Sequence, residues 1–526
     1  MSLSSKDPGM ETDILVVGSG FAGSLAAMVA RRLGRSVIMV ERGRHPRFVI
    51  GESSTPMAAL LWTELARRYD LTRLAPLAKW GSWRRAYPEI ACGLKRGFSF
   101  IHHTAHTPFR DGLDHQRQLL VASSSTDETA DTHWYRPEFD HFLVTEAQNM
   151  GVTYFDQTAL SQVSWTGTRI EAVGQRLGSS FSVRARLLID ATGPRGFMHR
   201  ALRLPTGSLV ELPHTEALYS HFRGVRRFGD MGIHEFAGAP YPIDDAALHH
   251  VFEGGWIWVL PFNNGITSAG IAVETTLARE LRLEDGAPAW ERVLARLPSV
   301  REQFAAAQSV APFIHSPHLP FFSPVMSGPR WVMLPYAAGF VDPLLSTGFP
   351  LSLFGLLRLA GIMEKDLEGA EFEQGIAGYS ASTHAELGAA QRLVGALYAT
   401  MGDFPMFARI TLLYFAAASF SEASWGLGRP QQAGGFLLHD HPGCGRAFAE
   451  CCRHAVRLYR RGSVSEDERE ALTVQILEAI EPVNVAGLGR ADRVNWYPID
   501  AADLRSAGSK LGVSSREIEA LLACAR

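Results

Sequence analysis

Three glycines and one carboxylate have the residue types and the spacing that bind a dinucleotide. Gly18, Gly20 and Gly23 form a Gly-x-Gly-x-x-Gly pattern directly after an apolar run that ends at Val17. In such a turn the first glycine permits the tight bend, the second lets a pyrophosphate approach the backbone, and the third permits close packing of the next helix. Glu41, 23 positions after Gly18, would accept hydrogen bonds from a ribose diol and repel a 2′-phosphate. A purely structural glycine turn is the alternative interpretation.

Two later turns favour FAD over NAD as the nucleotide. Asp190-Ala-Thr-Gly193 follows one apolar stretch, and Gly339-Phe-Val-Asp342 follows another. Flavoproteins of this general type use several such segments, and Asp342 would hydrogen-bond the ribityl chain of the flavin. Each turn alone would more often be an ordinary loop, so the inference depends on their order and spacing.

The hydropathy pattern predicts the β-α-β unit that these residues need. Residues 13–17 and 36–40 are apolar runs typical of buried parallel strands, and residues 21–33 between them carry helix formers. Further strands are expected at 186–190, within 248–273 and at 331–335, and the chain turns largely helical from 351 onward.

We therefore predict an α/β protein with an FAD-binding Rossmann-type (p-hydroxybenzoate hydroxylase-like) fold, a mixed-sheet substrate domain and a helical C-terminal region. The FAD-binding module is expected over residues 1–205 and 325–360, including the strand around Lys95. The substrate-side sheet domain is expected over 206–324 and the helical region over 361–526.

Composition argues against several other classes of protein. The formal net charge of −3, without a clustered basic face, argues against nucleic-acid binding. Five cysteines lack zinc-type spacing, and His102, His103 and His106 have no carboxylate or cysteine to complete a set, so we expect no metal and a cytoplasmic protein. The polar residues 1–10 do not resemble a signal peptide, and no uninterrupted apolar run reaches about 18 residues. We expect no membrane span, and we interpret residues 410–420 as part of a core helix.

Several further segments resemble the flavin-dependent halogenases. Gly255-Trp-Ile-Trp-Val-Leu-Pro261 resembles their W-x-W-x-I-P motif, with Leu260 in place of the usual isoleucine. Other segments resemble the monodechloroaminopyrrolnitrin halogenase branch more closely, in order along about residues 12–355: His45–Ser54, Gly93–Phe98, Tyr135-Arg136 with Asp140, His249–Trp256, Pro261–Asn264 and Gly339–Leu344.

The resemblance gives Trp256, Trp258 and Lys95 their expected roles. Two tryptophans two residues apart share one face of a strand, where their rings would keep organic substrate from the flavin while halide enters. Lys95 would hold hypohalous acid, or form a haloamine, beside the arene, and a lysine is a compact cation whose pKa moves when it is desolvated. The alternatives are aromatic strand packing for the tryptophans and a surface ion pair for the lysine.

Strand alternation over residues 93–100 makes a second prediction about Lys95. It places Gly93, Lys95, Gly97 and Ser99 on one face, with Phe98 and Phe100 on the other. The small neighbours of Lys95 would then leave room for a passage or a substrate.

The resemblance also implies a halide site and the remaining cofactor contacts. The backbone N–H groups of Thr347 and Gly348 would bind chloride or bromide. Leu345 stands where tryptophan halogenases carry a glutamate, which argues against tryptophan as the substrate and fits the phenol and pyrrole branches. Glu52 would gate communication between the flavin and the active site. The full set expected to contact the cofactor is Gly18, Gly20, Phe21, Ala22, Gly23, Glu41, Arg42, Arg47, Ser53, Arg136, Asp190, Gly193, Asp342 and Gly348.

The predicted activity is FADH2-dependent halogenation of an electron-rich aromatic in secondary metabolism. Halide would be oxidised at a flavin hydroperoxide formed with O2, and hypohalous acid would pass the tryptophans to Lys95. A separate flavin reductase would supply the reduced FAD, and the protein would be a monomer or homodimer. A flavin-dependent aromatic monooxygenase, a polyprenyl reductase of the same fold and a non-catalytic FAD-bound sensor are the alternatives.

Overall fold

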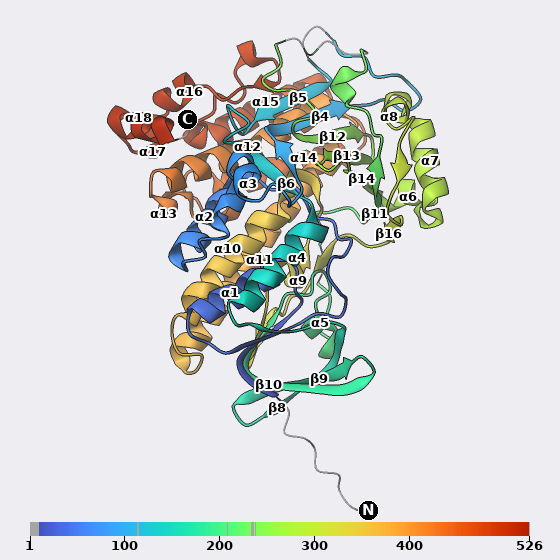
Figure 1. Ribbon diagram of the computed structural model, residues 1–526. Coiled ribbons are helices and arrows are strands. Elements are labelled where there is room, and N and C mark those ends of the chain that lie inside the picture. Colours follow the sequence, from blue (N-terminus) through green and yellow to red (C-terminus); the bar gives the residue numbers. More distant parts are fainter. Residues whose placement is uncertain (1–9, 113–114, 208, 233–235, 237, 525–526) are drawn as a thin grey trace, which may run out of the picture.

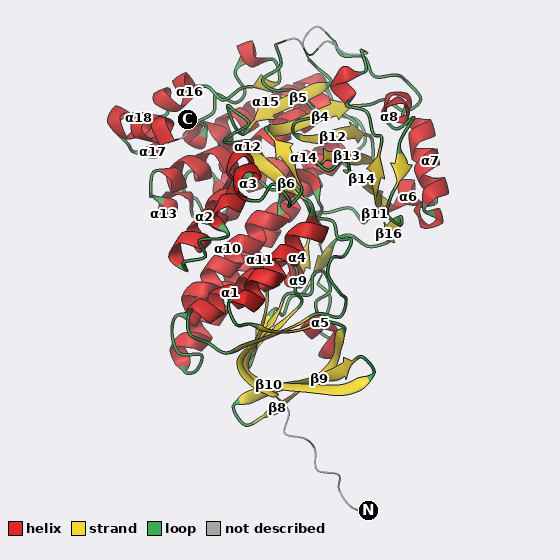
Figure 2. Cartoon of the chain, viewed as in Figure 1, coloured by secondary structure: helices red, strands yellow, loops and turns green. Residues whose placement is uncertain are grey.

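A computed structural model describes residues 10–112, 115–207, 209–232, 236 and 238–524 of the chain. Two large sheets organise the molecule, and helices fill the space around and between them (Figures 1 and 2). The strands and helices together confirm the predicted α/β class with a helical C-terminal region.

The first sheet has the parallel centre that the glycine turn requires. Its strand order is β18-β19-β10-β1-β2-β7, and the five strands from β19 to β7 run parallel. β1 (Met10–Val17) and β2 (Val37–Val40) flank α1 (Phe21–Arg32), as the sequence predicts, and Ile14, Leu15 and Val16 are fully buried. The other strands are β7 (Thr153–Phe155), β8 (Thr158–Thr166), β9 (Arg169–Arg176), β10 (Ser179–Asp190), β18 (Ser327–Gly328) and β19 (Trp331–Met333).

The second sheet is mixed, and each of its faces packs on different helices. Its order is β15-β11-β14-β13-β12-β4-β5-β21, with β16 beside β11. One face, which includes Leu248 and Ile257, joins a core with α6 (Thr275–Leu281), α7 (Ala287–Arg296) and α8 (Pro298–Gln303). The other face, which includes Phe98 and Trp256, joins the main core with the C-terminal helices. Its strands are β4 (Gly97–His102), β5 (Gln118–Ala122), β11 (Thr215–Arg223), β12 (Ala247–Phe252), β13 (Gly255–Pro261), β14 (Thr267–Glu274), β15 (Gln308–Ser309), β16 (Ile314–Ser316) and β21 (Trp496–Tyr497).

The sheets draw strands from across the predicted domain boundaries. β4 and β5, from the first predicted segment, pair into the second sheet, and β21 from the C-terminal region extends its edge. The exact division of the chain into domains stays a prediction.

The segment around Lys95 is not one strand, so that prediction is wrong. β3 (Cys92–Lys95) pairs with β6 (Asp131–Trp134) in a separate two-stranded sheet, and β4 begins at Gly97 in the second large sheet. Between them the Arg96 N–H donates to the Asp245 carbonyl, and the Arg96 carbonyl accepts from Ser123. These contacts with distant residues redirect the chain at Arg96.

Two long apolar helices form much of the core below the second sheet. α10 (Gly348–Met363), with the turn before it, and α12 (Phe404–Gly426) are long and apolar enough to cross a membrane by length and composition alone. Their most apolar windows are 67% and 78% buried inside the protein, as core helices are. α2 (Pro56–Arg68), α4 (Arg136–Asn149), α11 (Ala370–Thr400), α14 (Gly445–Tyr459) and α15 (Glu466–Ile480) complete this helical layer (Figure 1).

Candidate active site

A cavity of about 480 Å³ is lined by both the glycine turn and the tryptophan pair, a size typical of small-molecule and cofactor sites. Its lining includes Gly18, Gly20 and Glu41, and also Trp256 and Trp258 of β13. It thus brings together residues from both sheets.

The glycine turn has the geometry that its sequence predicts. Gly18 has φ +99°, and a Cβ there would lie 2.6 Å from the Ala191 carbonyl oxygen of the second turn. A Cβ on Gly23 would overlap the Gly18 carbonyl, so the helix start and the strand end can meet only without side chains. Phe21 and Ala22, at the start of α1, also line the cavity, where the first amide groups of the helix lack partners within it.

Glu41 is held at the cavity wall as a carboxylate. The backbone N–H groups of Ser19 and Gly43 donate to it over 3.2 and 2.9 Å, and Arg47 lies 3.5 Å away. Burial alone would raise the pKa of Glu41, but Arg47 and the two N–H groups outweigh burial and lower it. A charged acceptor with this support suits a ribose diol. Arg42 lines the cavity beside it.

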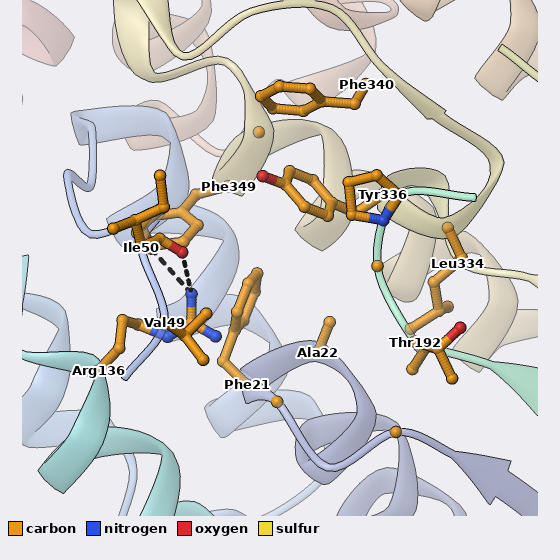
Figure 3. Close-up of a pocket in the computed structure, with 18 of the residues that line it drawn as sticks. Phe21, Ala22, Val49, Ile50, Arg136, Thr192, Leu334, Tyr336, Phe340 and Phe349 are labelled. Carbon is orange, nitrogen blue, oxygen red and sulfur yellow. Dashed lines mark hydrogen bonds between the residues drawn. The ribbon is translucent and has the colours of Figure 1, made fainter. Parts of the chain in front are cut away.

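Arg136 binds the backbone of a segment that lines the cavity, residues 49–53. Its guanidinium binds both carboxylate oxygens of Asp140 and donates to the carbonyls of Ile50 and Gly51 over 3.4 and 2.8 Å. Figure 3 shows Arg136 directed at the segment that carries Val49 and Ile50, with the Phe21 ring beside it. Arg136 therefore holds this segment in place, and it also lines the cavity as a predicted cofactor contact.

The two acidic turns differ in where their carboxylates point. Both oxygens of Asp190 accept hydrogen bonds from the protein itself, from Thr192 and from the Met198 N–H. Asp190 is fully buried and braces the turn, whereas Thr192 and Gly193 line the cavity. Asp342 lines the cavity directly, and burial raises its pKa to about 7 although the Leu344 N–H and Tyr398 donate to it.

The tryptophan pair shares one face of β13, as the two-residue spacing predicts. Trp256 and Trp258 are 1% and 5% exposed, their ring centroids lie 5.6 Å apart, and both line the cavity. The Trp256 N–H donates to the Tyr398 hydroxyl, which in turn donates to Asp342. The Trp258 N–H donates to Ser268. Both rings are thereby fixed between the cavity and the interior.

Lys95 does not line the cavity but hydrogen-bonds to a residue that does. Its side chain is fully buried, and Nζ donates to Ser53 Oγ over 2.8 Å and to the Ser54 carbonyl over 2.5 Å. Ser53 lines the cavity and therefore separates it from the amine. Burial lowers the pKa of Lys95 to about 7, and the Asp131 carboxylate offsets part of that fall.

The packing around Lys95 corrects the predicted faces of its segment. Nζ lies 3.8 Å from the centre of the Phe98 ring, so Phe98 does not face away from it. A Cβ on Gly93 would overlap the Pro261 carbonyl, and one on Gly97 would overlap the Val121 carbonyl. The space beside these two glycines is filled by backbone carbonyls, so they permit close packing of backbones and do not themselves make room for a substrate.

Glu52 belongs to the segment of residues 49–53 that Arg136 binds and that lines the cavity. Its Oε1 lies 2.8 Å from His221 Nε2, and both side chains are buried. The Trp134 N–H donates to the Glu52 carbonyl, which links the segment to β6. The predicted gating role of Glu52 stays a prediction.

The predicted halide site lies at the start of α10. Gly348 is the first residue of the helix and lines the main cavity, while Thr347 lines a small adjoining pocket. The preceding Leu345 and Ser346 have φ of 65° and 55°, and Leu345 is fully buried. Leu345 thus presents an apolar side chain to the core where a glutamate would have been costly without a partner.

The residues of the cavity fit an FAD molecule. The buried Arg47 Nε and His45 Nδ1 have no hydrogen-bond partner within the described part of the chain, and Arg47 lines the cavity beside Glu41. A donor so placed suits a phosphate or a flavin oxygen. Among the residues that the structure describes, no group of three or more His, Cys, Asp or Glu side chains could hold a metal ion.

Three contributors to the site were missed by sequence reasoning. Tyr336 lines the cavity across from Arg136 (Figure 3), Tyr398 connects Trp256 to Asp342, and His221 pairs with Glu52. None lies in a recognisable motif, and only their positions in the fold bring them to the site.

Comparison with known proteins identifies the family. A model of FAD dependent oxidoreductases matches residues 13–201, and a model of tryptophan halogenases matches residues 131–403, more than half of the chain. The monodechloroaminopyrrolnitrin halogenase PrnC of Pseudomonas fluorescens is 30% identical over 68% of this chain and 63% of its own length. The tetracycline 7-halogenase of Kitasatospora aureofaciens is 27% identical over 64% of this chain and 60% of its own length. The chain therefore spans less than two thirds of either relative.

A solved structure supports the fold independently. The halogenase PltM in complex with phloroglucinol and FAD superposes with a TM-score of 0.82, at 22% identity, over 92% of this chain and 99% of PltM. This likeness confirms the predicted flavoprotein fold, and the predicted cofactor FAD agrees with the first family model. Because the halogenase model matches more than half of the chain, the protein belongs to the flavin-dependent tryptophan halogenase family.

Proposed function

We propose that this protein uses reduced FAD, oxygen and a halide ion to halogenate an electron-rich aromatic compound of the phenol or pyrrole type through Lys95. The observation that carries the proposal is a fully buried lysine whose acceptor, Ser53, lines the FAD cavity. When bound, reduced FAD would activate oxygen, which supplies the oxidising equivalent that turns halide into hypohalous acid. Gly18, Gly20, Glu41 and Arg47 would hold its nucleotide half, and Asp342 would face the ribityl chain.

The environment of Lys95 supports a chemical role for it. Its hydrogen-bond acceptors are the uncharged oxygens of Ser53 and Ser54. A buried lysine without a directly bonded carboxylate destabilises the fold, and such perturbed groups cluster at functional sites. An amine with a pKa of about 7 exists in both forms near neutral pH. The neutral form is a nucleophile, and the charged form is a hydrogen-bond donor to hypohalous acid.

The tryptophan pair supports a separation between oxidant and arene. Both rings line the same cavity as Ser53, the hydrogen-bond partner of Lys95. Fixed by Tyr398 and Ser268, they would exclude an aromatic substrate from the flavin end, while a hypohalous acid is small enough to pass. An aromatic hydroxylase would have no use for such a screen.

Aromatic side chains near Lys95 support an aromatic substrate. Phe98, which contacts the amine, also contacts Tyr414 and Phe415 of α12, with ring centroids 5.9 and 5.4 Å apart. Phe100 contacts Phe407 of the same helix at 5.8 Å. An arene would stack or pack edge-on among such rings.

Two observations favour a phenol or pyrrole over tryptophan. Leu345 stands where tryptophan halogenases carry a glutamate. PltM, which shares the fold, was solved with phloroglucinol, a phenol. A separate flavin reductase as the source of reduced FAD, the amides of Thr347 and Gly348 as the halide site, and a cytoplasmic monomer or homodimer complete the proposal.

Mass spectrometry of products formed with bromide tests the proposal. The protein is supplied with reduced FAD, oxygen, bromide and a panel of phenols, pyrroles and indoles. We expect a bromine isotope doublet in a phenol or pyrrole product, lost in Lys95→Met and retained in Lys365→Met, which removes a lysine that is 54% exposed. A gain of one oxygen without bromine would instead identify a hydroxylase, and bromination retained by Lys95→Met would remove Lys95 from the mechanism.

A further inference from the structure

A buried carboxylate lies directly across from Lys95. β3 and β6 form an antiparallel two-stranded sheet in which Lys95 pairs with Asp131 and Gly93 pairs with His133. Asp131 is 1% exposed and Lys95 is fully buried. Side chains at paired positions of antiparallel strands have Cβ atoms about 5 Å apart, so the two charges face each other without a direct hydrogen bond.

Asp131 is already paired with a second lysine. Lys79 Nζ donates to Asp131 Oδ1 over 2.9 Å, and the Ser123 hydroxyl donates to Oδ2 over 3.3 Å. The Lys79 side chain remains 32% exposed and so reaches water. Burial alone would lower the pKa of Lys79, but Asp131 and Glu422 raise it, which keeps Lys79 charged.

The C-terminal helical region contributes two more groups. Glu422 and Tyr414, both on α12, interact electrostatically with Asp131. Burial raises the pKa of Glu422 to about 7, against the opposing effect of Lys79. On the other side of Lys95, His133 and His249 are neutral, because burial and then the charge of Lys95 lower their pKa values to about 3. Asp131 is therefore the nearby carboxylate whose charge offsets the burial of Lys95.

We propose that Asp131 is a positioning residue for Lys95, its buried counter-charge, and that Lys79 sets how much of that charge Lys95 receives by sharing the same carboxylate. The inference rests on the proposed function of Lys95 and adds the groups that control its protonation. It assigns a role to two charged residues, Asp131 and Lys79, that are not among those lining the FAD cavity. Lys79 also links the buried carboxylate of Asp131 to solvent, because its side chain is 32% exposed.

The two partners of Asp131 predict opposite effects. Removing the carboxylate in Asp131→Asn takes away the attraction, so the ionisation of Lys95 moves to lower pH by roughly 1 unit or more. Lys79→Met removes the cation that partly neutralises Asp131. The charge of Asp131 then acts more strongly on Lys95, and the ionisation of Lys95 moves to higher pH. A merely structural defect would not shift it in opposite directions.

The first measurement is the pH dependence of kcat/KM for bromination by the FAD-loaded enzyme between about pH 5 and 9. We expect the inflection near neutrality to move down in Asp131→Asn and up in Lys79→Met, with partial recovery of the wild-type position in Asp131→Glu. Asp127→Asn is the matched control, because Asp127 is 54% exposed and pairs with Arg96, the residue next to Lys95. It should leave the inflection in place, since an exposed charge is screened. An inflection unmoved by Asp131→Asn, or moved the same way by both variants, overturns the inference.

The second measurement does not depend on activity. A double-mutant cycle compares the effect of Lys95→Met on urea unfolding in the wild-type and Asp131→Asn backgrounds at pH 7. Lys95→Met should stabilise the protein more in the Asp131→Asn background, where the amine has lost its counter-charge, and additive effects overturn the inference. If the wild type fails to brominate any arene while the cycle shows coupling, the proposed function fails and the pairing stands. If the wild type brominates while the cycle is additive, only the pairing fails.

Discussion

Lys95 should make the folded protein less stable near neutral pH, and its removal should therefore stabilise it. Burial lowers the pKa of Lys95 from its ordinary 10.5 to about 7. Each tenfold change in proton affinity is worth about 1.4 kcal/mol, so this fall costs the folded state about 4 to 5 kcal/mol at pH 7. Lys95→Met removes that cost but leaves the Ser53 hydroxyl and the Ser54 carbonyl without their donor, which costs about 1 to 2 kcal/mol. A net gain of about 3 kcal/mol in the free energy of unfolding is expected.

The sign of the pH dependence gives the decisive test. The unfolded chain binds the Lys95 proton below about pH 10.5 while the folded protein binds it only below about 7, so the contribution of Lys95 to stability falls as pH drops through this window. Urea unfolding of the apoprotein should show Lys95→Met more stable than wild type at pH 7 and nearly equal to it at pH 10. Other titrating groups cancel in this comparison, and Lys365→Met controls for the loss of an exposed lysine. A Lys95→Met protein less stable than wild type at pH 7, or a difference independent of pH, would refute the reasoning.

Three further changes test other parts of the site. Glu41→Gln keeps the size of the side chain but loses the charge that faces the cavity, so the Kd for FAD should rise about 10- to 100-fold in a flavin fluorescence titration, and an unchanged Kd would contradict the ribose contact. Gly270→Ala places a Cβ against the Trp258 ring and 2.5 Å from Tyr219 Cβ. The ring must shift, which should cost about 1 to 3 kcal/mol and lower the product formed per oxygen consumed, whereas Gly378→Ala, with open space around it, should do neither. Asp342→Asn removes a carboxyl whose folded pKa is raised to about 7. The wild-type protein should lose stability through Asp342 as pH rises from about 4 to 7, because the unfolded chain releases the proton first. In urea unfolding, the variant should therefore have a higher free energy of unfolding than wild type at pH 8 but not at pH 4.

Local sequence patterns predicted the nucleotide half of the site well. The strand, glycine turn and helix from residue 13 to 33 depend on contacts within a few residues, and the carboxylate of Glu41 follows at the end of the next strand. The shared face of Trp256 and Trp258 follows from the two-residue period of a strand and needs no knowledge of the fold.

The surroundings of Lys95 could not be predicted in the same way. The strand is interrupted at Arg96 because the Arg96 N–H donates to the carbonyl of Asp245, almost 150 positions later in the sequence. Asp131 becomes the neighbour of Lys95 only because β6 pairs with β3 in one particular register. Tyr398 reaches Asp342 from a helix with no motif of its own. Such contacts join segments distant in sequence, where residue type alone carries little information.

The strand register of the second sheet places aromatic residues near Lys95 in one row with Trp258 of the cavity. Residues directly opposite one another on neighbouring strands form one row across β4, β12, β13, β14 and β11: Phe100, His249, Trp258, Gly270 and Tyr219. Phe100 adjoins Phe98 beside Lys95, and His249 and Trp258 line the FAD cavity. The glycine is needed in this row because the Trp258 ring lies over it. A slip of one residue in any of these four pairings would send the side chains beyond it to the opposite face of the sheet. This row therefore sets where Trp258 lies relative to Phe100 and its neighbour Phe98, the ring on which the Lys95 amine packs. If Lys95 acts as proposed, variants that disturb the pairing should lose halogenation before they lose FAD.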